Sequence, residues 1–130
     1  MALAPRRVAS SVSGAVTETL EMGCLAAAAV GDWVYVSLAT PNFVDVATDN
    51  QDKRAIIGKI SAKPTTILAT VVLSGVQPTA LITSGRVYLG ATGEETTANI
   101  TGPAFQQNIG YSFGNGLLRV SPSSVVTKLL

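Results

Sequence analysis

One polar loop of the sequence gathers the oxygen-bearing side chains that a hard metal ion would need. Asp45, Asp49 and Asp52 lie close together in the chain, with two amide side chains at positions 50 and 51. Calcium binds such oxygens, but a dedicated calcium loop alternates its ligands and closes on a glutamate, and this loop does neither. The basic pair Lys53-Arg54 would also compete for the carboxylates. We therefore predict a solvated loop with local ion pairs, no metal site and no stoichiometric calcium binding.

The other reactive side chains do not form a catalytic group. The sequence has no histidine, which removes the commonest general base and excludes a Ser-His-Asp triad. Cys24, the single cysteine, borders an alanine-rich run and is expected to pack as a small hydrophobic side chain. Glu94 and Glu95 follow a turn glycine and are interpreted as plain surface charge. The sequence therefore predicts a protein that is not an enzyme, with no catalytic residue and no cofactor.

The composition limits the partners that the chain is expected to bind. Charged residues make up 13% of the chain, about half the usual share, while apolar residues make up 47%. The net charge is +1, and the aromatic residues do not line up with basic ones in the sequence, so nucleic acid is not an expected ligand. The apolar run 25–30 is far shorter than the about 20 residues that cross a bilayer, so no membrane partner is expected. The low charge density suggests instead that protein contacts cover much of the surface.

Strand-like segments separated by turn residues fill most of the chain. The alanine-rich segment 24–30 has a helix-forming composition and predicts at most two helical turns before Gly31. Pro41-Asn42, Lys63–Thr65 and Asn115-Gly116 predict turns, the last of them a tight hairpin. The predicted strands are 33–39, 43–47, 55–62 and 66–75 in the first half and 86–91, 95–100, 108–114 and 117–122 in the second, with a loop at 101–107.

The two halves repeat the same landmarks in the same order. A Val-Tyr pair comes first in each half, then a glycine in the middle of an apolar strand, then a short β-like segment ending in serine. A glycine inside a strand indicates a bulge or a close backbone approach. The matched landmarks are Tyr35 with Tyr88, Gly58 with Gly110, and residues 72–74 with residues 119–121.

The repeat and the strand spacing predict the fold class. We expect an all-β protein, a small antiparallel β-sandwich or barrel of about eight strands. It would be built from two pseudo-repeated four-strand units, at about 31–75 and 84–122, within a single β domain at 23–130. Residues 1–22 hold few large apolar side chains and are expected to form an extended N-terminal arm, with a strand only near its end.

The second half of the chain resembles a known family. The segment "GRVYLGATGEETT", followed by "QNIGYSFGNGLLRVSP", is similar to capsid decoration proteins, or cement proteins, of tailed bacteriophages. The resemblance extends from residue 31 over about 90 residues and does not include the first 22. It implies a non-enzymatic virion protein, made in the host cytoplasm, that binds and stabilises the outer surface of the assembled capsid.

The resemblance also implies partners and a candidate interaction site. The expected partners are the major capsid protein and other copies of the chain, with a trimer as the expected homo-oligomer. The arm is expected to become ordered against the capsid or a neighbouring subunit, whereas a solvated terminus is the simpler reading of its basic pair. The candidate interaction residues are Arg6, Arg7, Val8, Val12 and Val16.

A second function stays open at this stage. Similar domains occur in head fibres and tail parts, so the chain is alternatively a head-fibre base or a tail attachment module that recognises a host surface. In that case the loops 48–54 and 101–107 would make the contacts.

Overall fold

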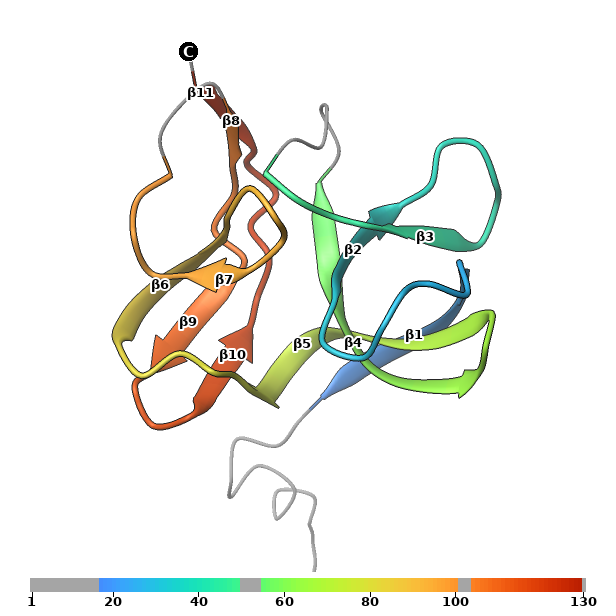
Figure 1. The fold of residues 1–130 in the computed structure, drawn as a ribbon, viewed down its shortest axis with the longest axis horizontal. Helices are drawn as coiled ribbons and strands as arrows, with labels where there is room; N and C mark the ends of the chain where they lie inside the picture. The colour runs from blue at the N-terminus through green and yellow to red at the C-terminus, as the bar shows by residue number, and fades with distance from the viewer. Residues whose placement is uncertain (1–16, 50–54, 101–103, 130) are drawn as a thin grey trace, which may run out of the picture.

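The structure, a computed structural model, describes residues 17–49, 55–100 and 104–129. These residues contain β-strands and connecting turns and no helix, which confirms the predicted all-β class (Figure 1). The strands are β1 (Glu18–Cys24), β2 (Trp33–Val36), β3 (Phe43–Val46), β4 (Ile56–Thr65), β5 (Leu68–Pro78), β6 (Ser84–Leu89), β7 (Glu95–Thr96), β8 (Ala104–Gln106), β9 (Gly110–Phe113), β10 (Leu117–Val120) and β11 (Thr127–Leu129).

The first half of the chain closes into a five-stranded barrel. Going round the barrel, β1 pairs with β3, β3 with β2, β2 with β4, β4 with β5, and β5 returns to β1. The β1–β3 pair is parallel and the other four pairs are antiparallel. Closure leaves few free strand edges, which are otherwise sites of unwanted pairing.

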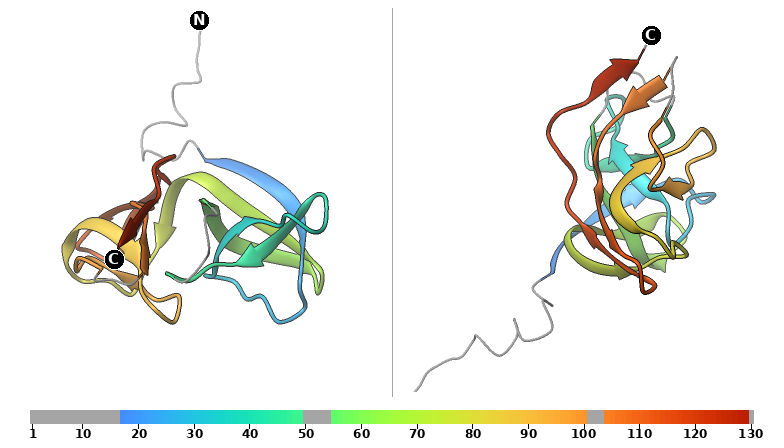
Figure 2. Two further views of the ribbon diagram at one scale, coloured as in Figure 1. Left: turned by 90° about the horizontal axis from the view of Figure 1, so that it is seen from above. Right: turned by 90° about the vertical axis from the view of Figure 1, so that its left-hand side faces the viewer.

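The last residues of β5 carry the sheet into the second half. Gly75–Pro78 pair with β10, and the order then runs β10, β9, β6 and β7. A separate pair, β8 with β11, lies at one end of this half. Figures 1 and 2 show the two halves side by side, joined along β5 and β10.

The sheet order agrees with the repeat predicted from the sequence. On either side of the β5–β10 junction the order is the same: β5, β4, β2, β3 in one direction and β10, β9, β6, β7 in the other. Val34 lies opposite Gly58, and Val87 lies opposite Gly110. Tyr35 and Tyr88 each follow the valine of these pairs, so they occupy equivalent positions in the two halves.

The two matched glycines allow the same close backbone approach. A Cβ atom on Gly58 would lie 2.2 Å from the carbonyl oxygen of Val72, and one on Gly110 would lie 2.1 Å from the carbonyl oxygen of Arg119. Val72 and Arg119 are themselves the first residues of the matched segments at 72–74 and 119–121. The predicted structural role of both glycines is therefore confirmed.

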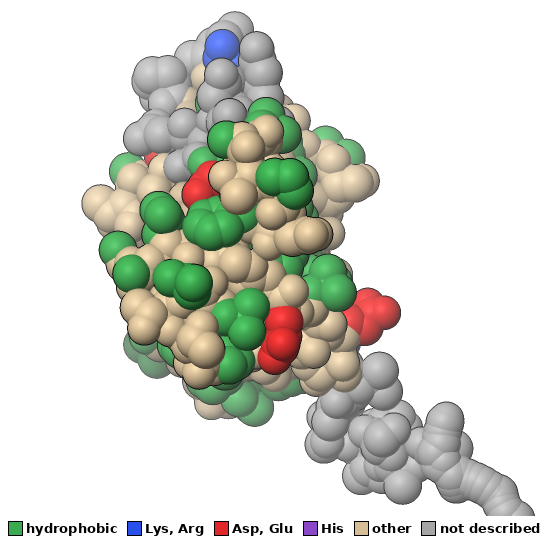
Figure 3. Space-filling view, turned by 90° about the vertical axis from the view of Figure 1, so that its right-hand side faces the viewer, with side chains coloured by type: hydrophobic (Ala, Val, Ile, Leu, Met, Phe, Trp, Pro, Cys, Tyr) green, Lys and Arg blue, Asp and Glu red, His purple; other side chains and the backbone are tan. Residues whose placement is uncertain are grey.

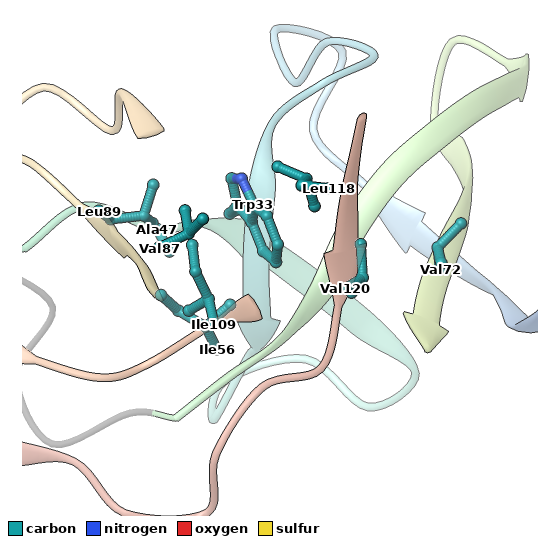
Figure 4. Packing of buried hydrophobic residues seen from close by; sticks show 9 residues of the cluster. All are labelled: Trp33, Ala47, Ile56, Val72, Val87, Leu89, Ile109, Leu118 and Val120. Carbon is teal, nitrogen blue, oxygen red and sulfur yellow. The ribbon is translucent and has the colours of Figure 1, made fainter. Parts of the chain in front are cut away.

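Two hydrophobic clusters stabilise the fold, and one of them joins the halves. The first fills the barrel with side chains from β1 to β5, including Val34, Val44 and Val71. The second lies between the halves around Trp33, whose side chain is 1% exposed (Figure 4). Each fully buried aliphatic side chain contributes about 1.5–3 kcal/mol, so the shared cluster holds the halves together. Its members are Trp33, Ala47, Ile56, Val72, Val87, Leu89, Ile109, Leu118 and Val120.

The predicted helical turns at 24–30 are wrong. Cys24 ends β1, and the alanines that follow form turns. The Lys63 ammonium donates hydrogen bonds to the carbonyl oxygens of Leu25, Ala26 and Ala28, the shortest being 2.6 Å to Ala28. A segment this short cannot form a stable helix by itself, so the tertiary partner of its carbonyls decides its conformation.

Several predicted boundaries also move. β4 continues to Thr65, so the turn predicted at 63–65 lies at residues 66–67. Residues 18–22, assigned to the arm, are paired with β5, which matches the strand expected near its end. The strand predicted at 95–100 is reduced to Glu95–Thr96.

The segment predicted as a loop at 101–107 contains a strand. Within it, β8 pairs with β11 from the C-terminal tail, a pairing partner more than twenty residues away in sequence. The turn predicted at Asn115-Gly116 is confirmed between β9 and β10. The hairpin at Pro41-Asn42 is confirmed as well, with Asn42 at φ 56°, a conformation that asparagine tolerates.

Candidate interaction surfaces

The candidate residues predicted in the arm lie outside the described part of the chain. Arg6, Arg7, Val8, Val12 and Val16 all belong to residues 1–16. The described chain begins at Thr17, which lies against Gly75 at the start of β1.

The structure describes two of the three carboxylates of the predicted polar loop. Asp45 lies on β3 opposite Tyr35, and Asp52 lies outside the described residues. Among the described residues no group of three or more acidic or cysteine side chains is placed to hold a metal ion. Cys24 is buried in the barrel as a free thiol, in agreement with its predicted packing role.

Asp49 is a buried residue whose main chain links the two halves, and it is not solvated. It is only 9% exposed, and its main chain bonds to the second half at both atoms: its N–H donates to the Gly90 carbonyl and its carbonyl accepts from the Phe105 N–H. Its side-chain Oδ1 has no hydrogen-bond partner among the described residues. Burial, together with repulsion from Glu94, raises the pKa of the Asp49 carboxyl. The prediction of a solvated loop is therefore wrong at this residue.

We predict that Asp49→Asn makes the free energy of unfolding less dependent on pH. Because the pKa of Asp49 is raised in the folded state, its protonated form favours folding at acid pH, and that contribution is lost as pH rises through the folded-state pKa. The variant should gain stability relative to the parent chain as pH rises from about 4 to 7. Urea unfolding across this range measures the difference.

Glu94→Gln is the matched variant for this prediction. Removing the negative charge beside Asp49 lowers the pKa of its carboxyl, so the pH-dependent difference should shrink. Parallel pH profiles for Asp49→Asn and the parent chain would contradict the assignment.

Glu95 belongs to a buried polar network, so its interpretation as surface charge is wrong. Its Oε2 atom lies 2.6 Å from the Lys59 ammonium and accepts a 2.8 Å hydrogen bond from the indole N–H of Trp33. Its Oε1 atom accepts a 2.6 Å bond from the Thr79 hydroxyl. The side chains of Lys59 and Glu95 are 9% and 14% exposed, and the ammonium also donates to the carbonyl of Pro78. This network ties β7 to β2, β4 and the end of β5.

The outward face of β6, β9 and β10 combines aromatic and basic side chains. Tyr111 on β9 lies opposite Arg86 on one side and opposite Arg119 on the other, and all three are exposed. Phe113 lies two residues further along β9, with its ring centroid 6.4 Å from that of Tyr111. The expectation that aromatic residues would not align with basic ones is therefore wrong on this face. We call these four residues, with Leu117 of β10, the arginine–aromatic face.

A second exposed apolar feature lies at one end of the barrel. Here an open hollow of about 520 Å³ is lined mainly by apolar side chains from β1, β2, β4 and β5, and also by residues 122–124, which follow β10. Leu20 and Val36 border it and are 49% and 41% exposed. We call this hollow the barrel mouth. Figure 3 shows hydrophobic side chains spread over the barrel side of the molecule, with few charged ones among them.

Fold and surfaces together describe an all-β protein with two exposed features, the arginine–aromatic face and the barrel mouth. No protein-family model, no curated protein and no solved structure matches the chain. Within the described ranges there is no helical segment with the length and hydropathy needed to cross a membrane.

Proposed function

We propose that the chain is a capsid decoration protein of a tailed bacteriophage, a non-enzymatic virion component. It binds the outer surface of the assembled head, where copies of the major capsid protein meet, and it associates with further copies of itself, with a trimer as the expected form. A protein that binds only the assembled shell stabilises that shell by mass action. Production in the host cytoplasm and a final place on the virion follow from this proposal.

The arginine–aromatic face is the observation that carries the proposal. Tyrosine and arginine are enriched among the residues that dominate binding energies at protein interfaces. Here Tyr111 and Phe113 are 49% and 45% exposed on a rigid sheet whose other side packs against the shared hydrophobic cluster. Side chains held by such a sheet lose little conformational entropy on binding, so the face is suited to a stable protein contact.

The experiment uses assembled heads of the phage that encodes the chain, prepared without this protein. We expect purified protein to bind them saturably, with on the order of hundreds of copies per head, as repeated lattice positions require. Tyr111→Ser combined with Arg119→Ser should weaken binding at least about tenfold, as loss of central contact residues does. Leu38→Ser, on an exposed loop away from this face, is the control and should bind normally.

Two results would contradict the proposal. Equal binding to heads by the parent chain and the double variant would exclude the arginine–aromatic face as the contact. About a dozen copies per particle, located at the tail, would favour the alternative function as an attachment module.

A further inference from the structure

The barrel wall has an opening beside the first residues of β1. β3 begins at Phe43, which lies opposite Gly23 of β1. Residues 18–22 of β1 therefore extend past the start of β3, paired with β5 on one side. No strand of the described residues pairs with their other side. A strand edge of this kind presents backbone N–H and C=O groups that a further strand can pair with.

The apolar side chains at this opening belong to the inside of the barrel. Leu20 lies opposite Val71 and Met22 lies opposite Ala69, and both partners are fully buried in the barrel core. Residues directly opposite each other in a sheet share a face, so Leu20 and Met22 point inward. Met22 is half-buried against the barrel core, whereas Leu20 is 49% exposed, because no strand of the described residues covers it on that side.

We propose that residues 8–16 of a second copy of this chain fill the opening, pairing with residues 18–22 of β1 and inserting valines into the barrel mouth. Val8, Val12 and Val16 are all even-numbered, so in an extended strand they lie on one face. The residues between them are alanine, serine and glycine, small enough to pass along the wall. Nine extended residues span about 30 Å, enough to cover the five-residue edge with its flanks.

Charge complementarity supports this occupant. Glu18 and Glu21 are exposed on the receiving strand, beside the barrel mouth. The inserted segment carries no acidic residue and is preceded by Arg6 and Arg7. The basic pair would therefore lie near carboxylates once the valines are seated.

The arm of the same chain fits the opening less well. A tight reversal at Ser13-Gly14 would place Arg7 opposite Leu20 in the apolar mouth, with Pro5, which has no N–H to donate, opposite Met22. If the turn were one residue longer, at residues 13–15, Val12 would pair with Val16. Both valines would then lie before Glu18, where the open edge begins. A segment from another copy is not held by such a turn, so it can seat Val12 at the mouth with Val8 and Val16 at its flanks. This self-association is independent of the proposed attachment to capsids.

Sedimentation velocity over a range of concentrations tests the proposal on the full chain. We expect the parent protein to be a concentration-dependent oligomer. Val12→Asp in the arm and Leu20→Asp in the mouth should each weaken association at least about tenfold, because each buries a charge in an apolar contact. Ile82→Asp is the matched control, since Ile82 is 85% exposed in the loop between β5 and β6 and does not line the barrel mouth, so its replacement should leave association unchanged. Circular dichroism checks that each variant is folded.

A cross-linking experiment identifies the occupant directly. One tagged chain carries Val12→Cys and a differently tagged chain carries Leu20→Cys, and the two are mixed under mild oxidation; the native Cys24 is 1% exposed. A disulfide between the two tags supports exchange between copies. In the double variant on one chain, a disulfide that forms only within the chain would show that its own arm fills the mouth. That result would overturn the proposal. A parent protein that stays monomeric would overturn it as well, and so would an oligomer whose association is unchanged by both aspartate substitutions. None of these outcomes depends on the head-binding test.

Discussion

Gly58→Ala and Gly110→Ala should each destabilise the protein by at least about 3 kcal/mol. In both cases the new methyl group would meet a backbone carbonyl oxygen of the neighbouring strand at close to 2 Å, as given by the distances of 2.2 and 2.1 Å. A backbone atom cannot move aside without breaking the strand pairing, so the clash can be relieved only by a loss of that pairing. Urea unfolding followed by the fluorescence of Trp33, the single tryptophan, measures the loss.

Gly90→Ala is the matched control for these two variants. The three atoms nearest to a Cβ there all belong to the end of the exposed Glu94 side chain, which can rotate away at the cost of its hydrogen bonds from Thr92. We expect a loss well below that of the other two substitutions. If Gly58→Ala and Gly110→Ala differed strongly from each other, the structural equivalence of the two halves would be contradicted.

The repeat could be predicted from the sequence because its signals are local. A Val-Tyr pair, a glycine inside an apolar strand and a short β-like segment ending in serine recur in the same order in both halves. Their order places Val34 opposite Gly58 and Val87 opposite Gly110, as the structure has them. Turn residues that bound strand-like segments also locate most of the strands.

The features that sequence reasoning missed all depend on distant partners. The sequence predicts a loop at Gln107, and this residue does lie outside the strands, but its buried side-chain amide bonds to both the N–H and the carbonyl of Ile56 and to the carbonyl of Ser123. Glu95 resembles surface charge until the fold places Lys59 and Trp33 beside it. No spacing rule connects residues this far apart in the chain.

The candidate surfaces could be predicted only in part from the sequence. The low charge density predicted extensive contacts, but it did not locate them. Arg86, Tyr111 and Arg119 become neighbours through strand pairing, and their alternation with buried residues marks them as outward-facing. The barrel mouth depends on the point at which β3 begins, which is a matter of register between β1 and β3.

Glu95→Gln should destabilise the protein by about 3 kcal/mol, the second of the two largest effects that we expect. The glutamine keeps the shape of the side chain and can still accept a hydrogen bond from Trp33. However, it leaves the Lys59 ammonium, whose side chain is 9% exposed, without its counter-charge. Because Trp33 contacts the same carboxylate, its fluorescence should change in the folded variant.

A double-mutant cycle with Lys59→Met separates the ion pair from general damage. Each single variant leaves one buried charge without its partner, whereas the double variant removes both charges. The loss of unfolding free energy in the double variant should therefore be clearly smaller than the sum of the single losses. Glu94→Gln, one residue away on the surface, controls for the local charge change, and we expect from it only the pH-dependent gain that follows from relief of its repulsion with Asp49. Additive losses would show that the two side chains act separately. A strong coupling would establish that this pair, and not only the hydrophobic cluster around Trp33, holds β7 of the second half against β2 and β4 of the barrel.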